Sequence, residues 1–310
     1  MTSGRVVAVV GPTGAGKSEL GIALARELGG EIINADSMQL YRGMDVGTAK
    51  VPPAQRGGIA HHLLDVWELE RSATVAAYQA IARASIEDVL ARGRTPILVG
   101  GSGLYLRAAL DPLDFPGESP QIRARLESEL AEAGPGELHR RLRIADPLAA
   151  TGILASNGRR LVRALEVIEL TGRPYSATLP SYESVYDVVH LGLDRADLDE
   201  RVGARVHQMI ADGFVEEVRS LLPRGLRAAP TAAKALGYAQ LLTVLDDSGR
   251  LVGDLPDAIG HTISRTRRFV RRQRSWFRRD HRIAWLDPSA ADLVAAAVRL
   301  ATGPPPILAR

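Results

Sequence analysis

Residues 11–18 have the sequence Gly-Pro-Thr-Gly-Ala-Gly-Lys-Ser, which has the spacing of a P-loop. Gly11 and Gly16 allow the tight turn that aims backbone N–H groups at an anion. Lys17 can reach terminal phosphates, Ser18 can bind Mg²⁺ through its hydroxyl, and a helix N-terminus favours negative charge. The motif predicts a site for a diphosphate or a triphosphate, built from Gly11, Pro12, Thr13, Gly14, Ala15, Gly16, Lys17 and Ser18.

Asp36 follows the strand-like run 31–35 and is the first candidate for acid–base chemistry. An acid at the carboxyl end of a strand beside a P-loop faces the ligand crevice of a parallel sheet. Its carboxylate could bind Mg²⁺ through water, orient a nucleophile or accept the proton of a nucleophile. The alternative is a turn residue or a helix N-cap.

The third strand-like run, 96–100, ends in Gly100, Gly101 and Ser102. A hydrolytic P-loop ATPase would have its metal-binding aspartate at that place. Glycines there indicate that the backbone comes close to a ligand. The missing acid argues against nucleotide hydrolysis.

An arginine-rich segment is the third candidate for binding, with nine arginines and one acid between Arg265 and Arg282. Four of these arginines recur at helical spacing and predict one basic stripe: Arg267, Arg271, Arg274 and Arg278. We expect an apolar face made of Ile259, Ile263, Val270 and Phe277. The stripe favours contact with nucleic-acid phosphates over the alternative of a solvated basic face.

The elements that must position these residues alternate between strands and helices. Strands are expected at 6–10, 31–35 and 96–100, with helices at 18–28 and 74–92, which is typical of a parallel sheet covered by helices. The chain is therefore predicted to be an α/β protein with a P-loop NTPase-like core at 1–115 and 183–300. This core includes a strand at 186–193, a helix at 198–212 and a largely helical C-terminal part. We expect an inserted all-helical subdomain at 116–182 and a flexible tail at 303–310.

The composition is that of a protein with a substantial core: 310 residues, 45% hydrophobic and 24% charged. The chain has no cysteine, which excludes disulfides and cysteine-based zinc sites. His61 and His62 point to opposite faces if they lie on a strand, so we expect no metal there. Neither a membrane span nor a signal peptide is found in the sequence, and we expect a cytoplasmic protein without membrane contact.

Taken together, the segments resemble the tRNA dimethylallyltransferases over nearly the whole chain, from residue 5 to about 287. The matching motifs are the P-loop, DSMQLY at 36–41, MDVGTAK at 44–50, HHL at 61–63, VGGSGLY at 99–105, RLVRALE at 160–166 and the TR…RQ…WFR pattern at 266–278. The ordered set is far more specific than any one motif.

The resemblance implies transfer of a dimethylallyl group from its diphosphate to the exocyclic amine of the adenosine 3′ of the tRNA anticodon. The tRNAs concerned read codons that begin with U. The P-loop would then hold the diphosphate of the allylic donor with Mg²⁺ on Ser18, and Thr13, Lys17 and Arg201 would neutralise the leaving group. Asp36 would be the base. The protein is expected to act as a monomer.

The resemblance also assigns residues to the tRNA partner. Asp36, Ser37, Met38 and Gln39 correspond to the segment that contacts the flipped base, and Ser102 lies where the family often has threonine near the RNA. Arginines of the inserted helices and of the basic stripe are candidate stem contacts: Arg123, Arg159, Arg160, Arg163, Arg267, Arg271, Arg274 and Arg278.

The sequence departs from the family at two positions. Ala239 stands in Gly-Tyr-Ala-Gln where arginine is common, and Arg159 replaces the usual glutamine before Arg160. Three other functions share some of the motifs: an ATP-dependent small-molecule kinase, an isopentenyltransferase for free adenine nucleotides, and a GTPase-like RNA-binding switch. The glycines after the third strand and the arginine-rich helix disfavour the kinase. The helical insertion disfavours the free-nucleotide enzyme, and no Asn-Lys-x-Asp run supports the switch.

Overall fold

The computed structural model describes residues 4–178 and 182–304. The chain divides into two compact units. The core unit contains the chain up to Leu110 and again from Ser184, and the helical unit is Asp111–Glu183. The sequence placed the insertion at 116–182. The helical unit thus starts a few residues earlier and ends one residue later than that range.

Within the described residues, six strands form one parallel sheet in the order β3-β2-β4-β1-β5-β6. The strands are β1 (Val6–Val10), β2 (Gly30–Asn34), β3 (His61–His62), β4 (Thr95–Gly100), β5 (Val188–Leu193) and β6 (Ile283–Leu286). β1 is buried along its whole length, as expected for a central strand with helices on both faces. The sheet therefore has one edge at which its strands end together, and the P-loop follows β1 at that edge.

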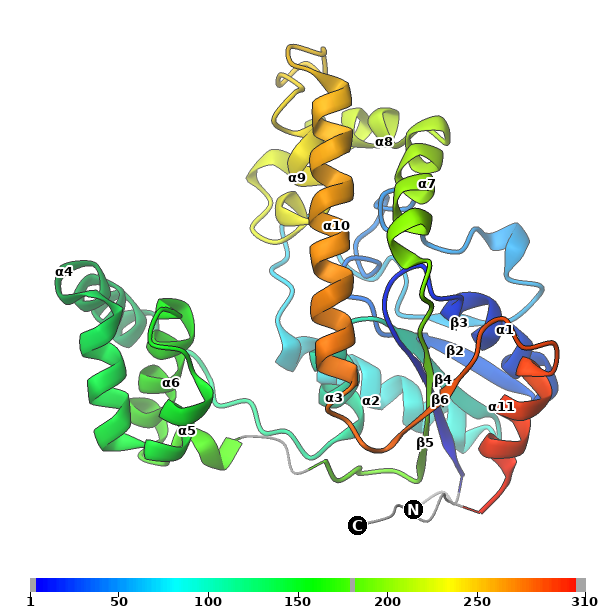
Figure 1. Cartoon of the computed structure of the whole chain (residues 1–310), viewed down its shortest axis with the longest axis horizontal. Coiled ribbons are helices and arrows are strands. Elements are labelled where there is room, and N and C mark those ends of the chain that lie inside the picture. The colour runs from blue at the N-terminus through cyan, green and yellow to red at the C-terminus, as the bar shows by residue number, and fades with distance from the viewer. Residues whose placement is uncertain (1–3, 179–181, 305–310) are drawn as a thin grey trace. The chain divides into compact units, whose positions relative to one another are not determined.

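Helices cover both faces of this sheet (Figure 1). The helices of the core unit are α1 (Lys17–Glu27), α2 (Val75–Ala91), α3 (Gly103–Leu110), α7 (Leu198–Ala211), α8 (Phe214–Leu221), α9 (Tyr238–Leu241), α10 (Leu255–Phe277) and α11 (Leu293–Thr302). Short 3-10 helices lie at Pro53–Gln55, Leu222–Arg224, Leu226–Ala228 and Ala232–Lys234. Val7 and Val9 pack with α1 and α11, whereas Val6, Ala8 and Val10 pack in the cluster that includes α2, α3 and α8 to α10. Because side chains alternate along a strand, β1 joins both cores.

The helical unit has its own small core. Its helices are α4 (Pro120–Ala145), α5 (Pro147–Gly152), α6 (Gly158–Thr171) and a 3-10 helix at Tyr175–Thr178. α4 is two helical segments joined at Gly134, whose φ of 77° interrupts the helix just before Pro135. Leucines of α4 and α6, such as Leu126 and Leu161, fill the space between these two helices.

The C-terminal part is largely helical, as predicted, and it also contains one strand that the sequence did not predict. Ile283–Leu286 forms β6, which pairs in parallel with β5. A run of four residues is too short a pattern for strand prediction, and pairing with β5 is what makes these residues extended. Among the described residues, no helix has the length and apolar character needed to cross a membrane. The expected flexible tail lies mostly outside the described residues.

One prediction on stability arises from Glu31, whose side chain is only 5% exposed. Its carboxylate pairs with both Nη atoms of Arg92 and with His62 Nε2 at 2.6 Å, and these hydrogen bonds lower the pKa of Glu31 to about 2. We expect Glu31→Gln to lower the free energy of unfolding at pH 7 by about 1–3 kcal/mol. The ionised form is favoured in the fold, so this contribution should be full above the usual carboxyl pKa and be lost as pH falls toward 2.

Urea unfolding of both proteins at pH 7 and at pH 3 measures this effect. The matched control is Glu27→Gln, which changes an exposed glutamate on α1. A difference between wild type and Glu31→Gln that stays constant from pH 7 to pH 3 would contradict the prediction.

Candidate active site in the core unit

A cavity of about 1100 Å³ lies at the carboxyl ends of the strands in the core unit. Its walls are the P-loop, the segment after β2, residues of the loop before β3, the end of β4 and one face of α7. This is the place where open parallel sheets bind ligands. Its polar lining includes Lys17, Asp36, Arg201 and Arg205.

The P-loop has the backbone that phosphate binding requires. Gly11 has a φ of 140°, and a Cβ there would lie 2.1 Å from the carbonyl oxygen of Leu193 on β5, so only glycine fits. Five of the eight loop residues line the cavity, namely Thr13, Gly14, Gly16, Lys17 and Ser18. Gly11, Pro12 and Ala15 are buried behind them. These three buried residues shape the loop and do not line the cavity.

Lys17 begins α1, and its Nζ donates to the carbonyl oxygen of Pro12 at 2.7 Å. Burial and the nearby Arg205 lower the pKa of Lys17 to about 8, while Asp36 and Glu19 oppose that shift. The lysine is thus held against the P-loop, and its ammonium group lies close to a second positive group, the guanidinium of Arg205. Such a place suits an anionic ligand.

Asp36 is both of the things that the sequence suggested, a turn residue and a cavity residue. Its Oδ1 accepts from the backbone N–H of Met38 at 2.9 Å, while its carboxylate lines the cavity. Asn34 holds the segment in place, because its side chain bonds Asp36 N, Asp36 O and Leu63 O at 2.9–3.0 Å. Burial raises the pKa of Asp36, although the Met38 N–H and Lys17 pull it down. A carboxyl group with a raised pKa is suited to proton transfer.

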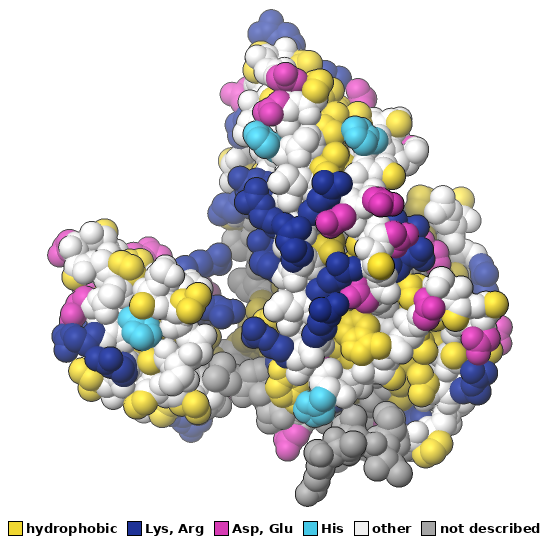
Figure 2. All heavy atoms as spheres, in the orientation of Figure 1, with side chains coloured by type: hydrophobic (Ala, Val, Ile, Leu, Met, Phe, Trp, Pro, Cys, Tyr) yellow, Lys and Arg dark blue, Asp and Glu magenta, His cyan; other side chains and the backbone are white. Residues whose placement is uncertain are grey.

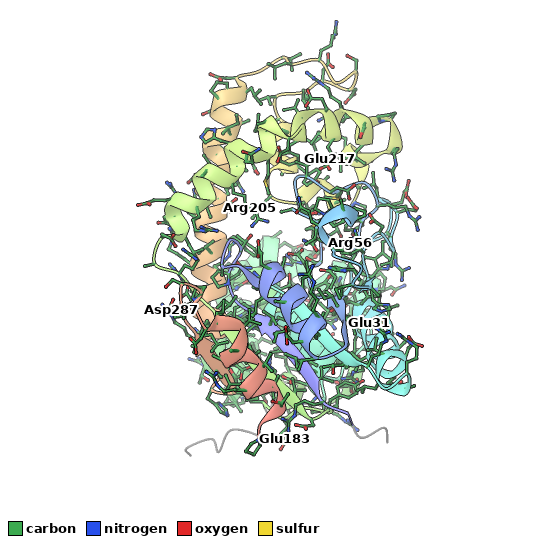
Figure 3. All side chains as sticks on the ribbon, turned by 90° about the vertical axis from the view of Figure 1, so that its right-hand side faces the viewer. Glu31, Arg56, Glu183, Arg205, Glu217 and Asp287 are labelled. Atoms are coloured by element: carbon green, nitrogen blue, oxygen red, sulfur yellow. The ribbon has the colours of Figure 1, made fainter. Side chains whose placement is uncertain are left out.

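Two arginines of α7 lie on the cavity side of that helix. Arg201, which the sequence proposed, donates from Nε to the carbonyl oxygen of Gly14 at 3.2 Å. Arg205 lies one helical turn further along and also lines the cavity, and Figure 3 shows its side chain on the side of α7 that faces α1. Burial lowers the pKa of the Arg205 guanidinium, and the nearby Glu19 and Asp36 carboxylates offset this. Sequence reasoning missed Arg205, although its i+4 spacing from Arg201 was a usable signal.

Gln273 on α10 links the P-loop to the end of β4, which sequence reasoning also missed. Its Oε1 accepts from the backbone N–H of Thr13 at 3.1 Å, and its Nε2 donates to Gly101 O at 2.9 Å. A Cβ on Gly101 would lie 2.4 Å from that Nε2, and one on Gly100 would lie 2.3 Å from Ala35 O. Gly100, the last residue of β4, and Gly101 therefore line the cavity and allow this end of β4 to lie close to Ala35 and Gln273.

Not all of the predicted base-contacting residues reach the cavity. Asp36 and Gln39 line it, and Gln39 Nε2 donates to the carbonyl oxygen of Thr48 at 3.1 Å. Ser37, Met38 and Ser102 are not part of this lining. Met38 packs against the apolar core, and Ser102 O accepts the first backbone hydrogen bonds of α3.

Arginines of α10 gather on one surface, where Figure 2 shows the Lys and Arg side chains concentrated. The predicted stripe is divided: Arg267 donates to Asp199 O, and Arg274 pairs with Asp194 at 2.8 Å. Arg278 is exposed and lies 3.5 Å from Asp194. Arg271 is exposed, as are four arginines outside the predicted stripe: Arg265, Arg268, Arg272 and Arg279.

The apolar face of α10 is partly confirmed. Val270 and Phe277 are buried, whereas Ile259 and Ile263 are half-buried. The buried face also contains polar Thr262 and Gln273. Their hydrogen bonds satisfy them there, which a hydrophobic pattern does not reveal.

In the helical unit, four predicted RNA contacts fall into two pairs. Arg123 and Arg163 both pair with Glu166, a fully buried carboxylate, at 2.7 and 2.9 Å. These two arginines therefore have a structural partner inside the unit. Arg159 and Arg160 are exposed at the start of α6.

The chain is similar to known proteins of one family. The model of the family described as IPP transferase matches residues 39–280. A tRNA dimethylallyltransferase of Parafrankia sp. (strain EAN1pec) is 60% identical over 299 residues, which cover 96% of this chain and 93% of that protein. One from Streptomyces avermitilis is 60% identical over 291 residues, covering 93% of this chain and 92% of that protein.

Solved structures are similar as well. The tRNA isopentenylpyrophosphate transferase of Bacillus halodurans matches with a TM-score of 0.68 and 36% identity, covering 96% of this chain and 94% of that chain. A eukaryotic dimethylallyltransferase acting on tRNA matches with a TM-score of 0.80 and 27% identity. That match covers 96% of this chain and 78% of the eukaryotic chain.

Proposed function

The chain belongs to the IPP transferase family, and from this premise we propose that it prenylates the adenosine 3′ of the anticodon in tRNAs that read U-initial codons. Prenyl transfer to tRNA, the broader part of this statement, is the activity for which its relatives are named. The donor in the proposal is dimethylallyl diphosphate, and the products are isopentenyladenosine in tRNA and diphosphate. The observation that supports it most is a carboxylate, Asp36, in one cavity with a P-loop and two arginines.

The donor's diphosphate would lie on the P-loop side of the cavity. Backbone N–H groups of the loop, Thr13 and Lys17 would hold it from one side, and Arg201 and Arg205 from α7. As the bond between the allylic carbon and oxygen breaks, negative charge grows on the departing diphosphate. Fixed positive groups stabilise that charge most where it develops.

The acceptor amine needs a base because its lone pair is delocalised into the adenine ring. As the new bond to carbon forms, the amine becomes acidic, and Asp36 would take its proton. The target base must first leave the stack of the anticodon loop to enter the cavity. Gln39 lines the same cavity and would contact the flipped base.

Mg²⁺ fits this site only with help from the substrate. Ser18 offers a hydroxyl to the cavity, and the described residues contain no group of three or more His, Asp or Glu side chains that could hold a metal. Mg²⁺ commonly binds through few protein ligands, with phosphate oxygens and water completing its shell. When bound, it would supply further positive charge to the diphosphate.

The exposed arginines of α10 are predicted to contact phosphates of the tRNA. We expect Arg271→Ala to weaken tRNA binding and to reduce the slope of log Kd against log salt by about 1, because one phosphate contact is lost. Titration of each protein with tRNA at several salt concentrations gives the Kd values from which this slope is obtained. Arg299→Ala, an exposed arginine on α11 that pairs with Asp292, is the control. Equal slopes for Arg271→Ala and wild type would refute the assignment of this arginine.

The function itself is tested by incubating the protein with Mg²⁺, dimethylallyl diphosphate and an unmodified tRNA transcript that reads a U-initial codon. Digestion and mass spectrometry should find isopentenyladenosine, and changing the target adenosine to guanosine should abolish it. Prenylated free AMP without any tRNA product would favour the free-nucleotide enzyme instead. ATP-dependent phosphorylation of a metabolite would favour the kinase.

A further inference from the structure

The loop Met44–Lys50 forms one wall of the cavity without being helix or strand. The residues of this loop that line the cavity are Asp45, Val46, Thr48, Ala49 and Lys50. Two amides are satisfied within the loop, since Ala49 N–H donates to Val46 O and Lys50 N–H donates to Asp45 O. The amides at the start of the loop need partners elsewhere in the protein. The residues that bind these loop amides therefore determine the shape of this cavity wall.

Glu217 on α8 provides those partners, and Figure 3 labels it. Its Oε2 accepts from the backbone N–H groups of Asp45 at 2.8 Å and Val46 at 2.6 Å. Its Oε1 accepts from the N–H of Gly47 at 3.1 Å and from the hydroxyl of Tyr238 at 2.5 Å. One carboxylate thus binds three consecutive amides and is itself oriented by a phenol.

Two aromatic rings pack against the backbone of the loop Met44–Lys50. The rings of Phe214 and Tyr238 meet edge to face with centroids 4.8 Å apart. A Cβ on Gly47 would lie 2.1 Å from the Phe214 ring and 2.6 Å from Tyr238. The loop backbone therefore rests directly on the rings while Glu217 holds its amides, which leaves it little freedom to shift.

The loop is connected to the residues expected to receive the base. Thr48 O accepts the hydrogen bond from Gln39 Nε2, and Gln39 follows Asp36 by three residues along the same cavity wall. Lys50, whose side chain is 3% exposed, pairs with Asp45 inside the loop and ties the loop to Asp65, each at 2.6 Å. A displaced loop would turn the Gln39 amide and move this wall, but it would not touch the P-loop.

We propose that Glu217, oriented by Tyr238, is a positioning residue that shapes the acceptor side of the cavity through the loop Met44–Lys50 and Gln39. The proposal rests on the proposed function in assigning that side of the cavity to the tRNA base. The groups proposed to bind the donor belong to the P-loop and α7. A change at Glu217 should therefore affect the use of tRNA and leave the binding of dimethylallyl diphosphate unchanged.

The test uses the full chain carrying Glu217→Gln, which replaces one accepting oxygen with an amide nitrogen that cannot accept. We expect kcat/KM for tRNA to fall by about 10–100-fold, because a displaced loop would no longer align the acceptor base with the donor. The Kd for dimethylallyl diphosphate should be unchanged. Tyr238→Phe, which keeps the ring under Gly47, should give a smaller loss of the same kind. Amide hydrogen exchange at Asp45, Val46 and Gly47 should be faster in Glu217→Gln.

The matched control is Glu216→Gln, which changes the neighbouring exposed glutamate that pairs with Arg219 on the same helix. Equal losses for both substrates, or unchanged exchange at the three amides, would overturn the proposal. Faster exchange with an unchanged kcat/KM for tRNA would also overturn it. A wild-type protein without activity on tRNA would instead refute the proposed function, and the exchange measurement would still test the hold of Glu217 on the loop.

Discussion

Asp36→Asn is expected to lower the rate of prenyl transfer by on the order of 10²–10⁴-fold, because the base for the acceptor amine is lost. Asparagine keeps an oxygen that can accept from Met38 N–H, so the turn after β2 should remain. Single-turnover transfer to tRNA with saturating donor measures the chemical step. Melting temperature and donor affinity should stay close to those of the wild type.

The pH dependence of that rate gives a second, independent signature. Burial raises the pKa of Asp36, so the carboxylate should take up its proton at a higher pH than an ordinary aspartate does. The wild-type rate should therefore fall as pH decreases through that raised pKa, and the Asn variant should lack this limb. A variant with the wild-type rate, or with the same acid limb, would exclude Asp36 as the base.

Lys17→Met should lower kcat/KM for dimethylallyl diphosphate by about 10²–10³-fold, the usual effect of removing one group that stabilises developing charge. The pKa of Lys17 is lowered to about 8, so its charge is present below that pH and lost above it. Affinity for inorganic diphosphate should fall as pH rises above about 8. Isothermal titration across pH 6–10 would follow this change.

The control for this prediction is Lys234→Met, which changes an exposed lysine in a short 3-10 helix away from the cavity. Because a bound anion favours the protonated lysine, the midpoint in the complex should lie at or above the value of the free protein. Diphosphate binding by Lys17→Met with wild-type affinity and pH dependence would show that Lys17 is not a phosphate ligand.

The parts of the site that the sequence predicts best are those made by adjacent residues. The P-loop contains its turn, its lysine and its helix start within eight residues, so local chemistry was enough to predict it. Asp36 could be predicted because a strand end beside a P-loop has a known direction. β1 is a continuous apolar run, and its observed bounds, Val6–Val10, equal the expected ones.

The parts that the sequence did not predict depend on contacts between distant segments. Gln273 meets Thr13 across 260 positions, and a glutamine within an arginine-rich helix gives no sign of that role. The pairing of Arg123 and Arg163 with buried Glu166 is similar, since residue type predicts a charge but not its partner. β6 is short and needs β5 beside it before it becomes a strand.

The bond between Gln273 and Thr13 also bears on how the protein is made. During synthesis the P-loop emerges early, yet the amide that holds its Thr13 N–H is added only when most of the chain has been translated. Contacts this far apart in sequence form slowly, because a long loop must close first. A nascent chain that ends at α9 therefore carries the phosphate-binding motif without its support from α10. Donor binding should therefore reach its full strength only after α10 has been translated.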